Sequence, residues 1–249
     1  MTTSRKFATL LGVAIVAASL VAGVLPVAAQ DGEEYAPQKM CEVCHKLPQA
    51  DGEVAPVTDL YMETKHAKAE GEGPRYTAPD DEPGVGCQAC HGAGQKHVME
   101  HGAPEFIHNP EDIEEKEGRF SLCGRCHALY EEEWVEDYAF GDNILDDITL
   151  LDATGEKLQQ LSEMKDSKHF TDPTAPTCIN CHTGHKELSE ELPHQIRKPI
   201  NELCLECHAD QEDYAHSGWD EIPEDATCST CHMPNKKHVF VAPESADAL

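Results

Sequence analysis

All twelve cysteines of the chain belong to one repeated pattern with a definite chemistry. They form six Cys-x-x-Cys pairs, and a histidine directly follows every pair. Residues i, i+3 and i+4 share a helix face, so two thiols can bond a porphyrin's two vinyl groups while the histidine reaches its iron. Cys-x-x-Cys-His is the attachment motif of c-type haem. In chain order the motifs are Cys41, Cys44 and His45; Cys87, Cys90 and His91; Cys123, Cys126 and His127; Cys178, Cys181 and His182; Cys204, Cys207 and His208; and Cys228, Cys231 and His232.

Other uses of paired cysteines fit this pattern less well. Zinc ribbons, thioredoxin-like redox sites and the disulfides of secreted proteins all use closely spaced cysteines. None of them requires a histidine directly after each pair. The pattern therefore predicts six covalently bound haem c groups, with the motif histidines as proximal iron ligands, and it leaves no cysteine for disulfides.

Nine histidines lie outside the motifs, and they decide the character of the irons. An iron with two axial histidines is saturated and passes electrons, whereas an open iron can bind a substrate. Along the chain, a motif without flanking histidines alternates with a motif that has a histidine on each side. This repeat predicts three two-haem units, at roughly 30–110, 111–190 and 191–249, each with two candidate distal ligands. Bis-histidine ligation at all or most irons follows.

The individual distal ligands remain open at this point. The candidates that flank the motifs are His66, His97, His169, His185, His216 and His238, and the further candidates His101, His108 and His194 lie close to them in sequence. A methionine ligand is an alternative through Met40, Met62, Met99 or Met164. The surplus of histidine disfavours it, because scattered methionines more often serve packing.

The first 29 residues have the pattern of a secretory signal peptide. Arg5 and Lys6 precede an apolar stretch that ends at Leu25, and Val27-Ala28-Ala29 supplies small residues for cleavage. An uncleaved membrane anchor is the alternative. We expect cleavage before Gln30, no later membrane span, and a periplasmic or extracellular (cell-surface) location.

The charge of the chain restricts its partners. It has 47 Asp and Glu against 19 Lys and Arg, for a formal net charge of −28. Phosphate binding depends on Lys and Arg, so nucleic acid is not an expected partner. The acidity favours basic partners, or simply a solvated surface.

A hydrophilic chain with only 6% aromatic residues has little material for an ordinary core. We therefore expect a mostly α/irregular fold, with short helices and loops wrapped around a haem core and little or no β-sheet. The motifs should lie on brief helices. Glu131–Tyr138 and Glu156–Met164 are predicted as longer amphipathic helices, and Gly71–Gly86 and Asp172–Pro176 as loops.

At these residues the chain resembles the multihaem c-type cytochromes with doubled haem motifs. The resemblance rests on three sequence segments: Cys90-His91-Gly92-Ala93-Gly94 with a histidine shortly after, Ser167-Lys168-His169 ahead of Cys178, and Cys228 to Pro234. The resemblance implies stacked haem pairs in a conducting row. It also implies distal ligation by His66, His97, His169, His185, His216 and His238.

Three functions follow as hypotheses. The first is an exported carrier that passes electrons to redox partner proteins or to an extracellular acceptor. The second is an oxidoreductase for a small nitrogen or sulfur compound at one open iron, with His45 as the candidate because no histidine precedes its motif. The third is self-association into a conducting filament.

Overall fold

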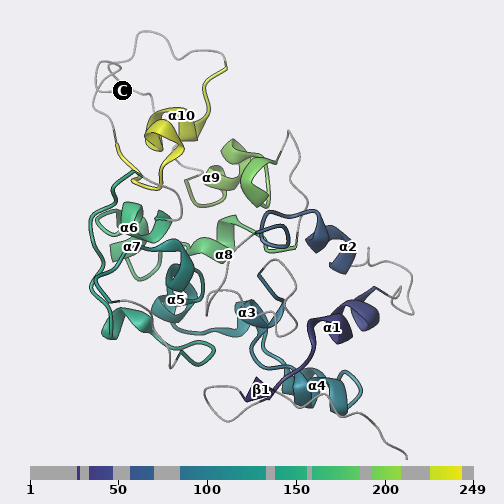
Figure 1. Ribbon diagram of the computed structural model, residues 1–249. Coiled ribbons are helices and arrows are strands. Elements are labelled where there is room, and N and C mark those ends of the chain that lie inside the picture. Colours follow the sequence, from purple (N-terminus) through teal and green to yellow (C-terminus); the bar gives the residue numbers. More distant parts are fainter. Residues whose placement is uncertain are drawn as a thin grey trace, which may run out of the picture.

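The computed structural model describes residues 27–28, 34–46, 57–69, 85–132, 138–155, 159–185, 192–208 and 225–242. Within these ranges the chain folds into short helices joined by loops (Figure 1). The helices are α1 (Gln38–His45), α2 (Val57–Met62), α3 (Gln88–His91), α4 (Gln95–Met99), α5 (Lys116–His127), α6 (Gln160–Met164), α7 (Lys168–Thr171), α8 (Cys178–Cys181), α9 (Ile200–His208) and α10 (Cys228–His232).

Single turns of 3-10 helix and very little strand complete the fold. The 3-10 turns are η1 (Pro104–Phe106), η2 (Pro110–Asp112), η3 (Ile144–Asp146), η4 (Pro193–Gln195) and η6 (Pro234–Lys236). Strands β1 (Val27–Ala28) and β2 (Glu34–Tyr35) pair antiparallel, with Val27 opposite Tyr35. The expectation of short helices and loops with little β-sheet is confirmed.

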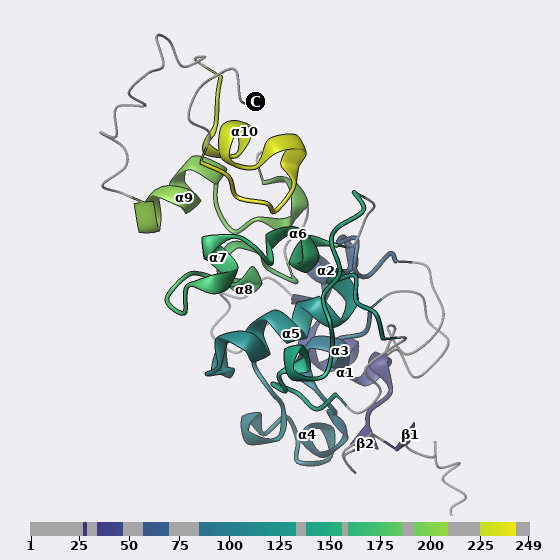
Figure 2. The ribbon, with the colours of Figure 1, turned by 90° about the vertical axis from the view of Figure 1, so that its left-hand side faces the viewer.

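Every haem motif lies on a helix, as predicted. The motifs coincide with α1, α3, α5, α8, α9 and α10, in that order along the chain, although Cys87 directly precedes α3 and His182 directly follows α8. Figures 1 and 2 show that these six helices also follow one another in space, from α1, which lies near α4 and β1, to α10 at the opposite end of the molecule. The linear order of the motifs is therefore also their spatial order.

A small apolar cluster surrounds α5 in the middle of this row. Phe120, Ile144 and Leu161 are almost fully buried there, between α5, η3 and α6. Ser121 links α5 to η3, because its hydroxyl donates to the Glu117 carbonyl of α5 and accepts from the Ile144 amide of η3. The described residues outside this cluster bury few large apolar side chains, as the polar composition predicted.

Two of the predicted segments need correction or trimming. Glu131 and Glu132 are in a bend and Tyr138 is in coil, so the described ends of the predicted helix Glu131–Tyr138 are not helical. The predicted helix Glu156–Met164 begins only at Gln160, where α6 starts. The Asp172–Pro176 loop is confirmed. Residues 133–137 and 156–158, most of Gly71–Gly86, and all of the signal segment except 27–28 lie outside the described residues.

None of the helices within the described ranges has the length and apolar character needed to cross a membrane.

Glycine at position 118 of α5 is expected to be required by packing. An added Cβ would lie 2.5 Å from the carbonyl oxygen of Gly141 and 2.9 Å from Ile113. Helix propensity alone favours alanine by about 1 kcal/mol, but overpacking costs about 1–3 kcal/mol. We expect Gly118→Ala to destabilise the holoprotein, measured by guanidinium denaturation. Gly184→Ala is the control, since nothing lies within 4 Å of its Cβ; equal effects in both variants would contradict the steric explanation.

Candidate haem-binding sites

The structure pairs five motif histidines with histidines from outside the motifs. A metal–imidazole nitrogen bond is about 2 Å long, so two rings that ligate one metal from opposite sides have centroids about 6 Å apart. The observed pairs and centroid separations are His45 with His97 (6.3 Å), His127 with His66 (5.9 Å), His91 with His185 (5.7 Å), His208 with His169 (6.1 Å) and His182 with His238 (6.0 Å).

The ring planes of these pairs differ in their relative orientation. The rings of His45 and His97 are nearly parallel, at 11°, and those of His91 and His185 are at 4°. The pair formed by His66 is nearly perpendicular, at 86°. The pairs formed by His169 and His238 are intermediate, at 62° and 39°.

Burial favours the neutral form of several paired rings. The pKa of His66 is lowered to about 4, mainly by desolvation and to a smaller extent by the nearby His127 and His182. Desolvation likewise lowers the pKa of His238 to about 4. The pKa values of His45 and His185 are also lowered, mainly by burial. Neutral imidazole is the form that ligates metal, so the protonation state fits iron binding.

Backbone carbonyls hold several rings through Nδ1. The Nδ1 of His91 is 2.7 Å from the carbonyl oxygen of His108, and that of His232 is 2.8 Å from the carbonyl oxygen of Val241. In both cases the later residue also donates its amide to the motif histidine's carbonyl, at 3.1 and 2.9 Å. His182 lies 2.9 Å from the carbonyl oxygen of His194. Such bonds fix the tautomer and leave Nε2 to the iron.

These contacts close a loop after the second, fourth and sixth motifs. Each loop leaves its motif histidine, contains one of the favoured distal histidines, and returns to the motif histidine by a hydrogen bond. The candidates inside the loops are His97, His185 and His238, and each faces a different motif. The same local sequence thus anchors one motif histidine and presents a second histidine to another motif.

The motif cysteines lie on the six motif helices or directly beside them. The second cysteines of the motifs vary in exposure: Cys44, Cys90 and Cys207 are exposed, whereas Cys126, Cys181 and Cys231 are half-buried. Thioether formation at these residues, from Cys41 and Cys44 to Cys228 and Cys231, therefore stays a prediction that the placement on helices permits.

Hydrogen bonds also join consecutive motifs. Gln38, just ahead of the first motif, accepts the amide N–H of Cys87 at 3.0 Å. Arg125 in the third motif donates to the carbonyl of Ala89 in the second. Asn201 on α9 accepts the amide N–H of Cys228 at 2.8 Å.

Contacts between motif thiols agree with this order. The Cys87 thiol raises the pKa of Cys41 through a hydrogen bond, and the Cys178 thiol does the same to Cys123. Burial raises the pKa of Cys181, and nearby Cys207 adds to the effect. We number the sites 1 to 6 by motif order; each site then lies beside the next.

The ring pairs cross the boundaries of the predicted two-haem units. His66 of the first unit faces site 3 of the second unit, and His169 of the second faces site 5 of the third. In the other direction, His185 faces site 2 and His238 faces site 4. Among the five described pairs, only that of His97 lies within one predicted unit. Local stoichiometry suggested self-contained units, whereas the structure exchanges histidines between them.

The further candidates have other environments. The ring of His108 stacks on Phe140 at 4.4 Å, and the carbonyls of His108 and His194 hold motif histidines. His101 is exposed, with a φ of 58°. Met40, Met62 and Met99 are exposed, while Met164 packs in the apolar cluster. His216, the sixth favoured candidate, lies outside the described residues.

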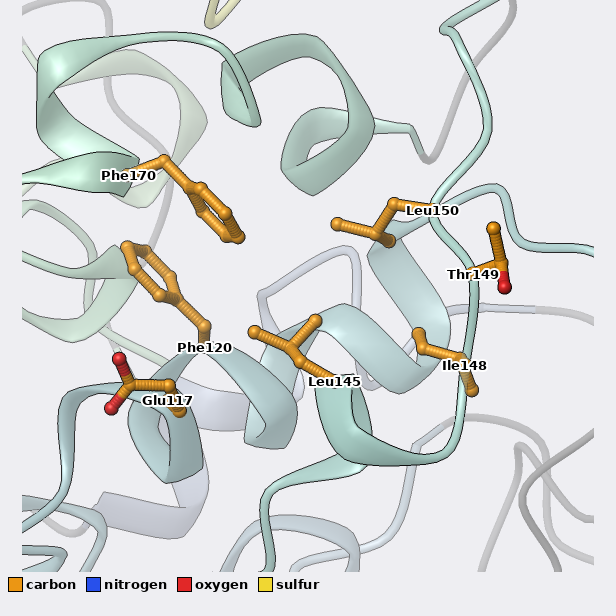
Figure 3. A pocket seen from close by; sticks show the side chains of 7 residues that line it. All are labelled: Glu117, Phe120, Leu145, Ile148, Thr149, Leu150 and Phe170. Carbon is orange, nitrogen blue, oxygen red and sulfur yellow. The ribbon is translucent and has the colours of Figure 1, made fainter.

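An apolar cavity of about 430 Å³ opens beside α5 (Figure 3). Figure 3 shows its lining, which is Glu117, Phe120, Leu145, Ile148, Thr149, Leu150 and Phe170. Phe170 directly follows His169, so the cavity adjoins the pair at site 5. None of the lining residues is a motif cysteine or histidine.

Comparison with known proteins agrees with the motif geometry. A family model described as the doubled CXXCH motif matches residues 172–213, which contain the fourth and fifth motifs. The chain is 25% identical over 190 residues to the multiheme cytochrome MtrA of Shewanella baltica (strain OS185), covering 69% of this chain and 52% of that protein. The chain thus spans about half the length of this relative.

A solved structure is also similar. The undecaheme cytochrome from the S-layer of Carboxydothermus ferrireducens is 21% identical, with a TM-score of 0.38, over 73% of this chain and 39% of that one.

Six attachment motifs on helices and five facing histidine pairs stand beside these matches. Together, the motifs and these matches support a multihaem c-type cytochrome. Its residues fit covalently bound haem c, because each described pair leaves room for one metal between two facing imidazoles.

Sequence reasoning missed the side chains that position these histidines. Gln160 contacts His127, and Glu163 contacts His238. Lys116, at the start of α5, donates to the carbonyls of His169, Phe170 and Asp172 at the end of α7. Nothing in the local sequence marks these three residues, since each acts on a histidine at least 33 positions away.

Lys116 is expected to hold α7 against α5 in this cytochrome. Lys116→Met removes hydrogen bonds from a cation to three carbonyls, and we expect a loss of about 1–2 kcal/mol of unfolding free energy. Lys168→Met is the matched control, because Lys168 is exposed and directly precedes His169. Guanidinium denaturation followed by haem absorbance measures the unfolding free energy of both variants. An equal loss in the control would contradict the role of Lys116 in holding α7 against α5.

Proposed function

We propose that this cytochrome is an exported electron carrier with six haem c groups in bis-histidine ligation. The observation that carries the proposal is the pairing of five motif histidines with five of the predicted distal histidines. The spatial succession of the motif helices supports conduction from one end of the molecule to the other (Figure 2). The signal-like segment 1–29 supports export, since c-type haem is attached outside the cytoplasm.

The distal ligands in this proposal are the predicted ones. His97, His185, His66, His238 and His169 ligate the irons of sites 1 to 5 in that order, and the motif histidines ligate the opposite faces. For site 6 we propose His216 as the partner of His232, because the other five flanking histidines already face other motifs. The three units then share one continuous set of ligands.

The chain's own residues prepare each site for its cofactor. When bound, haem supplies a one-electron iron couple. The cysteines would tether it, two imidazoles would ligate its iron, and the carbonyl-bound Nδ1 atoms keep several of these rings in one tautomer. An iron held by two imidazoles would exclude substrates. Net negative charge and two imidazoles favour the ferric state, so low potentials are expected.

The alternative enzyme hypothesis placed an open iron at His45. In the structure, the His97 ring lies opposite His45 at 6.3 Å and nearly parallel to it. This arrangement favours saturation at site 1 and therefore supports a carrier. Redox partner proteins or an extracellular acceptor are the proposed partners, and self-association into a filament is compatible with this role.

Haem content and spin state test the proposal. We expect a mass equal to the mature polypeptide plus six haems, and low-temperature electron paramagnetic resonance without a high-spin ferric signal. The ring angles of 11° at site 1 and 4° at site 2 predict rhombic low-spin signals for these two sites. The angle of 86° at site 3 predicts a highly anisotropic signal there. A high-spin signal from one full iron would overturn complete bis-histidine ligation.

Removal of a distal ligand should open one iron only. We expect His185→Ala to give carbon monoxide binding at one haem per molecule after reduction, because its ring faces His91 at 5.7 Å. His101→Ala is the matched control, since this exposed residue has no assigned iron. Equal carbon monoxide binding by both variants, measured by difference spectroscopy, would refute the assignment at site 2.

A further inference from the structure

Helix α6 places two side chains against the histidines of two consecutive sites. The side-chain oxygen of Gln160 is 2.8 Å from Nδ1 of His127, the motif histidine of site 3. One turn later, the carboxylate of Glu163 accepts the backbone amide of His238 at 2.9 Å. The same carboxylate oxygen lies 3.7 Å from Nδ1 of His238, whose ring faces site 4.

The contact between Glu163 and His238 is enclosed. The side chain of Glu163 is only 8% exposed. The Nδ1 atom of His238 is buried without a hydrogen-bond partner within bonding distance. The Glu163 carboxylate lies just beyond hydrogen-bond distance of this ring nitrogen, and a small ring rotation would close the bond.

The two side chains differ in charge while nearly matching in shape. An amide oxygen is a neutral acceptor for the Nδ1 hydrogen of a ligand, whereas a carboxylate forms a stronger, charge-assisted bond. A carboxylate on a metal-bound histidine raises the basicity of that ligand. A more basic ligand beside a fixed negative charge stabilises ferric over ferrous iron and lowers the reduction potential.

The cations near α6 have other partners. Lys165 pairs with Asp152 at 2.7 Å, and Arg197 pairs with Glu111 at 3.2 Å. Arg197 also donates to the backbone carbonyl of His182 at 3.0 Å, on the proximal side of site 4. Among the described lysines and arginines none forms an ion pair with Glu163, so the charge of this carboxylate acts directly on the distal ring.

We propose that Glu163 is a positioning and potential-setting residue, which makes the haem at site 4 lower in potential than its neighbour at site 3. Gln160 performs the same positioning at site 3 without charge. This inference rests on the proposed ligation of site 4 by His182 and His238. Helix α6 thereby produces a difference in reduction potential between the haems of sites 3 and 4, in the middle of the row.

The test removes the negative charge at Glu163, or adds one at Gln160, in the holoprotein. We expect Glu163→Gln to raise one of the six midpoint potentials, changing that haem's oxidation equilibrium about tenfold, or about 59 mV for one electron. All haems should remain low-spin. Gln160→Glu should lower a different potential by a similar amount. Glu163→Asp, which retains the carboxylate, should restore much of the native value.

Two further variants identify the site and control for net charge. His238→Met marks the component that belongs to site 4, because methionine opposite histidine raises the potential strongly. Glu114→Gln removes one charge from an exposed side chain and should leave the individual potentials in place. Equilibrium redox titration with electron paramagnetic resonance of each poised sample measures all five variants.

The outcomes separate this inference from the proposed function. If Glu163→Gln stays low-spin and the component marked by His238→Met does not move, the inference is wrong while the ligation stands. If His238→Met changes no component, or the native site 4 is high-spin, the proposed ligation itself fails. Should Glu163→Gln not fold, Gln160→Glu decides, and an unmoved site 3 potential overturns the inference.

Discussion

The facing of two imidazoles across a gap wide enough for one metal ion is the constraint on which the rest of this structure depends. It requires two rings about 6 Å apart that face each other from separate chain segments, with their second nitrogens already bonded elsewhere. The five described pairs meet the distance, and several of their rings have Nδ1 acceptors. Short helices suffice for this purpose, because each has to present only one motif.

The modest apolar core follows from the same constraint. A few buried side chains around Phe120 and Leu161 occupy the middle of the molecule, where α5, η3 and α6 meet. Elsewhere the described segments are joined mainly by hydrogen bonds to backbone carbonyls and by histidine pairs. A polar chain can fold in this manner when bound cofactors contribute the apolar interior and the folding free energy.

Because histidines of one predicted unit face motifs of another, the three units are linked along the row of sites. His66 of the first predicted unit faces site 3, and His169 of the second faces site 5. Disruption of one loop therefore affects a neighbouring site as well as its own. The residues that contact these histidines, such as Gln160, Glu163 and Lys116, give the protein a means to differentiate sites with identical ligands.

The sequence alone was sufficient for the haem motifs, the short-helix fold and the choice of His66, His97, His169, His185 and His238 as the histidines of interest. A haem-attachment motif of five consecutive residues can be recognised without the tertiary structure, because covalent attachment depends only on the local spacing of its cysteines and histidine. The pairing of those histidines needed the tertiary structure. Sequence proximity grouped His185 with the second two-haem unit, whereas the fold places it opposite His91 of the first unit, since each loop turns back on its own motif and directs its histidine toward another motif.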